Sequence, residues 1–123
     1  MENQNEKGNH YPTQRKQIIY NDFSDCGMED VFQVIGQAAP LIRTQPEKSV
    51  LILSDFTGSV HNAQLLSALR EFTAGNAPHV KASAIIGMTG MKKVLYDTVM
   101  KFTGRNIPIF DDADQAKEWL VTQ

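Results

Sequence analysis

The sequence predicts an α/β fold in which a strand and a helix alternate four times within a single domain, a (βα)4 arrangement. Two observations predict this class. Short aliphatic runs typical of buried strands are separated by longer stretches whose apolar residues recur every three or four positions, as on one face of a helix. These stretches are long enough for helices that cross between parallel strands, so we expect four mainly parallel strands with packed helices.

The core domain is expected to span residues 17–123, because residues 1–16 offer only Met1 and Tyr11 for burial. Burying two side chains does not offset the entropy of ordering that segment, so 1–16 is predicted to be a flexible N-terminal tail. The overall composition, with 41% hydrophobic residues, is typical of a globular protein.

Charge and cysteine content exclude several classes. A net charge of -2 lacks the basic excess that broad nucleic-acid binding needs. No apolar run approaches the ~20 residues of a membrane span, and the N-terminus lacks the apolar stretch of a signal peptide. Cys26 is the single cysteine and has no basic neighbour in sequence, so we expect a passive thiol and a cytoplasmic protein.

The first half of the domain is predicted from its apolar pattern. A strand at 17–23 precedes a helix that begins at Met28, in which Pro40 is expected to cause a kink or break near Ala39. The consecutive aliphatic residues 50–53 predict a central strand buried on both faces. A second helix is expected to end at Gly75 and Asn76 in a left-handed cap. The expected inner faces are Met28, Val31, Phe32, Ile35, Ala38, Ala39 and Ile42 for the first helix and Leu65, Ala68, Leu69 and Phe72 for the second.

The second half repeats the alternation. A third strand is predicted at 79–88 and a short fourth strand at 107–110. The helix between them is expected to end at Gly104, and Asp111 or Asp112 is expected to cap the last helix. The predicted inner face of the third helix is Met91, Val94, Leu95, Thr98, Val99 and Phe102, and that of the last helix is Ala116, Trp119 and Leu120.

Parallel strands bring all four strand-to-helix loops to one edge, where α/β sheets bind ligands. The first candidate site there is the pair Thr57 and Ser59, directly after the central strand. A hydroxyl at this position caps a helix, or it accepts a phosphate that the helix N-terminus stabilises. Ser59 is the preferred phosphosite and Thr57 the second choice.

The second candidate is the loop Gly87, Thr89, Gly90, Lys92 and Lys93. Cations are disfavoured in the first turn of a helix, so these lysines form either a solvated basic face or a site for an anion or an acidic partner. If the site binds an anion, a phosphate on Ser59 is its expected ligand. The third candidate is the carboxylate set Asp22, Asp55, Asp111 and Asp112, which ends strands and caps helices or holds Mg²⁺; we predict no metal site.

A resemblance to a known family is carried by two segments, PEKSVLILSDFTGS and KASAIIGMTGMKKVLYDTVMKFTGRNIPIFDDADQAKEWL. Together with the element order, they resemble small stand-alone bacterial proteins with the STAS-like fold, which anti-sigma-factor antagonists and lipid-binding CRAL-TRIO domains share. The likeness covers about residues 17–121 and implies a right-handed β-α superhelix without enzymatic activity. The phosphorylated hydroxyl of the antagonists lies in a D-S-[ST]-G type loop. The corresponding loop here is Asp55, Phe56, Thr57, Gly58 and Ser59, in which Asp55, Thr57 and Gly58 fit the motif and Phe56 stands where it has a hydroxyl residue.

We therefore expect a STAS-like regulatory or protein-interaction module, switched by phosphorylation in the loop after the second strand. Its partner is an unknown protein that contacts the edge around Thr57, Ser59 and Lys92. No complete catalytic set is visible, and no cofactor is predicted. Three alternatives remain open: a carrier of a lipid or small hydrophobic ligand, a homodimer, and a Mg²⁺-dependent phosphoacceptor.

Overall fold

The computed structural model describes residues 17–59, 62–90 and 92–123, and there it confirms the α/β class and the alternation of strands and helices. The predicted tail, 1–16, lies outside these ranges. The strands form one parallel sheet in the order β1-β2-β3-β4, with β1 at Ile18–Asp22, β2 at Val50–Asp55, β3 at Val80–Ile86 and β4 at Ile109–Phe110.

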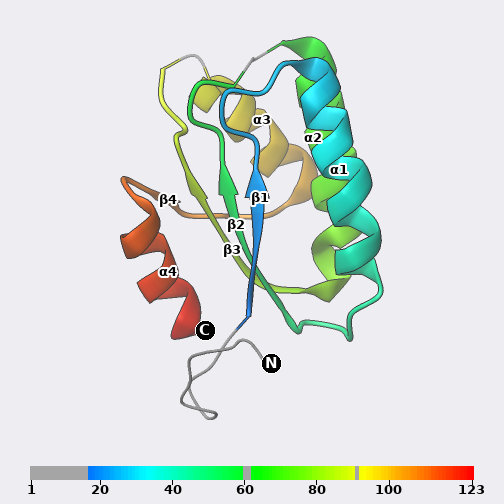
Figure 1. Cartoon of the computed structure of the whole chain (residues 1–123), viewed down its shortest axis with the longest axis vertical. Coiled ribbons are helices and arrows are strands. Elements are labelled where there is room, and N and C mark those ends of the chain that lie inside the picture. Colours follow the sequence, from blue (N-terminus) through cyan, green and yellow to red (C-terminus); the bar gives the residue numbers. More distant parts are fainter. Residues whose placement is uncertain (1–16, 60–61, 91) are drawn as a thin grey trace.

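Helices cover both faces of this sheet (Figure 1). On one face lie α1 (Met28–Arg43), α2 (Ala63–Asn76) and α3 (Lys92–Thr103), while α4 (Ala113–Val121) packs on the other face against β2 and β3. A short 3-10 turn, η1 (Ala77–His79), joins α2 to β3. Because neighbouring strands are also consecutive in the chain, the three crossovers run over the same face.

The central strand is buried on both faces, as its sequence predicts. Val50 and Ile52 belong to the core beneath α1, α2 and α3, whereas Leu51 and Leu53 belong to the core beneath α4. Leu53 has no exposed surface. Both β3 and β4 are shorter than expected, because His79 belongs to η1 and Ile107 precedes β4 as a buried loop residue.

Pro40 does not break α1, so that part of the prediction near Ala39 is wrong. The helix continues to Arg43, and the Thr44 N–H donates to the Pro40 carbonyl at 3.2 Å. Proline removes one helical hydrogen bond. Ala38 and Ile42 lie within two residues of it and are buried, so their packing holds the last turn in place.

The predicted left-handed cap at Gly75 and Asn76 is also wrong. The helix includes both residues, and Ala77 after them is still right-handed. Gly75 instead lies beneath the Arg43 side chain, since a Cβ placed on it would lie 2.3 Å from a guanidinium nitrogen of Arg43. The space above Gly75 is occupied by the Arg43 guanidinium, whose Nε donates to Asn76 Oδ1 at 3.0 Å.

The inner face of α3 differs from the predicted one. Val94 and Phe102 are 59% and 57% exposed, and Thr98 is also exposed. Val99 is buried and Tyr96 and Met100 pack beside it, while the side chains of Met91 and Leu95 lie outside the description. Phe102 instead lies under the Arg70 guanidinium of α2, 3.9 Å from its ring centroid. The helix carries two overlapping apolar stripes, and packing against α2 selects one.

Phe32 on α1 is a second misassigned residue, since half of its surface is exposed. On α2, the predicted burial of Leu65, Leu69 and Phe72 is confirmed. Two end signals are confirmed. Gly104 after α3 is left-handed, with φ +69, and Asp112 is the cap of α4, where its Oδ1 accepts the Gln115 N–H at 2.9 Å.

Candidate functional site

The loops at the carboxyl edge of the sheet interlock, as the parallel arrangement predicts. The Asp25 N–H of the first loop donates to the Thr57 carbonyl of the second at 2.7 Å. Gly87 of the third loop packs against Thr57 so closely that a Cβ would lie 2.4 Å from its backbone nitrogen. Gly58 similarly packs under the Asp25 carboxylate. The sequence-predicted residues of these three loops are therefore neighbours.

Thr57 and Ser59 differ in what they offer to a modifying enzyme. The Thr57 side chain is exposed, whereas Ser59 is 7% exposed and its hydroxyl donates to the Phe56 carbonyl at 2.9 Å. Neither residue caps α2, contrary to one of the two expectations for them. The cap is Asn62, whose Oδ1 accepts the Leu65 N–H at 2.9 Å.

Phe56 separates Asp55 from the hydroxyl residues of the loop and has a packing role. Its buried ring stacks on that of Phe23, with centroids 4.9 Å apart, and Phe23 in turn meets the edge of Phe72 at 6.3 Å. Aromatic pairs in these geometries contribute about 0.5–1.5 kcal/mol each beyond area burial. This cluster fixes the loop to the core at the point where the predicted phosphosite begins.

The carboxylates of β1 and β2 serve local structure. Asp22 and Asp55 are register partners on neighbouring strands. Asp55 accepts the Thr57 N–H through Oδ1 and the Tyr20 hydroxyl through Oδ2, both at 2.9 Å. Partial desolvation and this hydrogen bond raise the pKa of Tyr20 to about 12. Asp22 accepts the N–H and hydroxyl of Ser24.

The other polar candidates are more dispersed. Asp111 is exposed beyond β4, two strands away from β2 in the sheet order. Thr89, Gly90 and Lys93 are exposed at the start of α3, and the Lys92 side chain lies outside the description, so its pairing with Ser59 stays a prediction. Within residues 17–59, 62–90 and 92–123, no cluster of three or more His, Cys, Asp or Glu side chains could hold a metal ion.

Cys26 is buried and its Sγ lies 3.7 Å from the Asp22 carbonyl oxygen. Desolvation, together with the carboxylates of Asp30, Asp22 and Asp25, raises the pKa of this thiol. A raised pKa lowers the fraction of reactive thiolate.

A cavity of about 60 Å³ lies beneath these loops, between the sheet and helices α2 and α3. Its walls are mainly apolar, and they include the aromatic cluster, Met88, Val99 and Met100. By the same measure one water molecule needs about 10–15 Å³, and a cavity of about 150 Å³ admits benzene. The cavity therefore has room for a few heavy atoms of a small molecule.

Polar side chains interrupt the apolar floor of the cavity. Asn21 and Ser54 are register partners on β1 and β2, and Ser83 lies on β3 opposite Ile52. Asn21 is 1% exposed, and its Nδ2 donates to Ser54 Oγ at a long 3.5 Å. Its Oδ1 accepts no hydrogen bond from any residue in the described ranges. An unpaired buried acceptor costs about 1–3 kcal/mol.

The far end of the cavity is lined by Thr73, Asn76 and Arg105. Thr73 and Asn76 lie in the last turns of α2, and Arg105 follows the end of α3. Both helices return the chain from the carboxyl edge to the amino edge of the sheet, so this polar end lies opposite the predicted loop site. Burial lowers the pKa of the Arg105 guanidinium by desolvation.

A scan against protein-family models, a search of curated proteins and a search of solved structures each find no match to this chain. Of the helices in the described part of the chain, none has the length and apolar character needed to cross a membrane.

Sequence reasoning missed the cavity and most of its polar residues. A signal was present on the strands, where Asn21, Ser54 and Ser83 interrupt otherwise apolar inward positions. Buried polar residues at such positions need partners, which makes them candidates for ligand contacts. No local signal identifies Arg105 or Asn76, because only the packing of α2 and α3 turns them toward the cavity.

Proposed function

We propose that the chain is a non-enzymatic binding module that takes a small, mostly apolar ligand into the cavity between the sheet and helices α2 and α3. The observation that carries this proposal is the buried amide of Asn21, which lines the cavity with an unpaired Oδ1 among the described residues. A ligand group that donates a hydrogen bond there removes the cost of the unpaired acceptor.

The composition of the walls supports a ligand of this kind. Small-molecule sites combine apolar and aromatic walls with a few polar groups that fix orientation. Here Phe23, Phe56 and Phe72 supply aromatic surface, while Asn21 and Ser83 supply polar atoms. The volume of about 60 Å³ limits the enclosed part of the ligand to a few heavy atoms.

Native mass spectrometry of protein recovered from its own cell tests the proposal. We expect a stoichiometric small-molecule adduct that is lost on denaturation. Ser83→Leu fills the cavity from its floor and should abolish the adduct, since the added side chain occupies the ligand volume. Ser67→Leu is the matched control, because Ser67 lies at an exposed position of α2.

Protein that is recovered empty, and that also fails to bind small apolar probes when they are added, would contradict the proposal. Equal adducts in the two Ser→Leu variants would contradict the assignment to this cavity. Thermal unfolding of both variants separates loss of the ligand from loss of the fold, and Ser83→Val is the milder replacement if Ser83→Leu unfolds.

A second candidate is the STAS-like regulatory module, switched by phosphorylation and read by a partner protein. The exposed side chain of Thr57, held between Asp25 and Gly87, favours Thr57 over Ser59 as the acceptor. Ser59 would require the loop to open, because its hydroxyl is buried. The same mass spectra test this function. It predicts the added mass of one covalent phosphate, which survives denaturation and disappears in Thr57→Ala or Ser59→Ala.

A further inference from the structure

Resting on the proposed function, we propose that the ligand of the cavity is a small hydroxy monocarboxylate: its carboxylate binds Arg105, its short apolar chain lies along the aromatic and methionine walls, and its hydroxyl donates to Asn21 Oδ1. The inference concerns the amino-edge end of the cavity, away from the loops that the sequence singles out.

At the end formed by Thr73, Asn76 and Arg105, hydrogen-bond donors find no acceptor among the described residues. Within the described ranges the Arg105 guanidinium has no hydrogen-bond or ion-pair partner; only its backbone N–H is paired, with Thr103 Oγ1 at 3.3 Å. The Thr73 hydroxyl is likewise unpaired in that part of the chain. The Arg105 side chain is partly buried. A partly buried guanidinium without a counter-ion is stabilised by a carboxylate, which it can bind in a bidentate manner.

Asn76 is an independent indication. Its side chain is 3% exposed and its Oδ1 accepts from Arg43 Nε at 3.0 Å. The oxygen is thereby fixed toward Arg43, so Nδ2 is the atom left for the cavity, and among the described residues it finds no acceptor. A buried amide donor without an acceptor needs a ligand or water oxygen.

Charge balance selects a monoanion. Arg105 is the one cationic side chain among the described residues that line the cavity, and no acidic side chain lines it. A carboxylate neutralises a single guanidinium, whereas a phosphate monoester, which carries more than one negative charge at neutral pH, would leave excess charge in an apolar site. The small volume also favours the more compact carboxylate group.

Methyl NMR of full-length protein with labelled methionines tests the proposal. Met88 and Met100 line the cavity and report occupancy, while Met28 on α1 does not line it and is the internal control. The probes are the short acids propionate, butyrate and 4-hydroxybutyrate and the alcohols in which CH₂OH replaces each carboxyl group. We expect saturable shifts at Met88 and Met100, with each acid binding at least about tenfold tighter than its alcohol.

Arg105→Gln should remove the preference for acids, so that each acid and its alcohol bind about equally. Arg70→Gln is the matched control, because Arg70 stacks on Phe102 and does not line the cavity. If acids and alcohols bind equally, or if butyl phosphate binds more tightly than butyrate, the carboxylate assignment is overturned and the proposed function stands. If no probe shifts Met88 or Met100, both fail. Should Arg105→Gln not fold, the comparison of acids with alcohols on the unmodified protein decides alone.

Discussion

Gly87→Ala is expected to destabilise the protein by separating two loops of the carboxyl edge. Gly87 has φ +77, a conformation that costs an alanine about 1–2 kcal/mol. Its Cβ would also lie 2.4 Å from Thr57 N and 2.8 Å from Thr57 Cα, both of them backbone atoms. Relieving that overlap requires movement of a loop whose Thr57 carbonyl accepts the Asp25 N–H. Overpacking of this kind costs about 1–3 kcal/mol more.

Gly90→Ala isolates the conformational part of this cost. Gly90 is also left-handed, with φ +60, but a Cβ there would meet nothing within 4 Å. Both substitutions reduce the freedom of the unfolded chain equally, so that contribution cancels between them. We expect Gly90→Ala to cost about 1–2 kcal/mol and Gly87→Ala about 2–5 kcal/mol.

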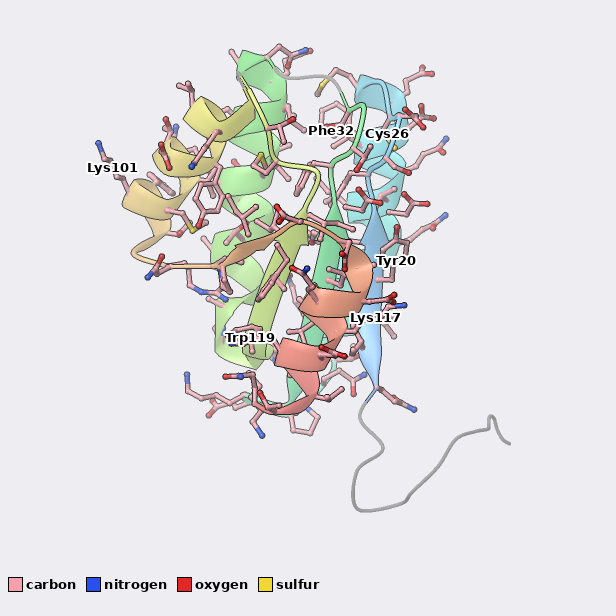
Figure 2. The ribbon with its side chains drawn as sticks, turned by 90° about the vertical axis from the view of Figure 1, so that its left-hand side faces the viewer. Tyr20, Cys26, Phe32, Lys101, Lys117 and Trp119 are labelled. Atoms are coloured by element: carbon pink, nitrogen blue, oxygen red, sulfur yellow. The ribbon has the colours of Figure 1, made fainter. Side chains whose placement is uncertain are left out.

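Urea unfolding followed by the fluorescence of the single tryptophan, Trp119, measures both values. With a slope of about 1–3 kcal/mol per molar urea, the two midpoints should separate clearly. Trp119 lies on α4 (Figure 2). It packs on Phe110 with ring centroids 5.7 Å apart, so its fluorescence reports the α4 face and, for a cooperative domain, global unfolding. Equal destabilisation by the two substitutions would refute the reasoning that Gly87 and Thr57 are in contact.

Two further predictions concern α4 and β1. Asp112→Ala should lower the free energy of unfolding by about 1 kcal/mol, because it removes the acceptor of the Gln115 N–H, whereas Asp112→Asn should be nearly neutral; equal losses in denaturant titration would contradict a capping role. Tyr20 should ionise near pH 12, and Asp55→Asn should return its pKa toward the usual value of about 10. Since the folded pKa is the higher one, its stabilising contribution is complete below about pH 10 and is lost as pH rises toward 12. Difference absorbance titration against Tyr20→Phe measures this, and ordinary titration of Tyr20 beside an intact Asp55 would contradict it.

The sequence by itself determined the features that depend on local or strictly periodic patterns. The aliphatic run 50–53 predicted a strand buried on both faces, because four consecutive buried residues require that both faces of the sheet are covered. The cap at Gly104 was predicted, and the cap of α4 was narrowed to Asp111 or Asp112, because backbone conformation and a nearby N–H decide such positions. The alternation of strands and helices was sufficient to bring the loops of Asp25, Thr57 and Gly87 to one edge.

Only the tertiary structure decided which side chains are inside. On α3 the sequence allows two apolar stripes, and the contact with α2 buries Val99 while Phe102 stays exposed under Arg70. Arg105 and Asn76 reach one cavity because two helices end at the same edge of the sheet, and Asn21 joins them from a strand far away in the chain. Local sequence patterns do not contain such convergence, because it arises from packing between distant segments. The candidate ligand site therefore lies in the packed core, and the loop after the central strand lines it through Phe56 and Ser59.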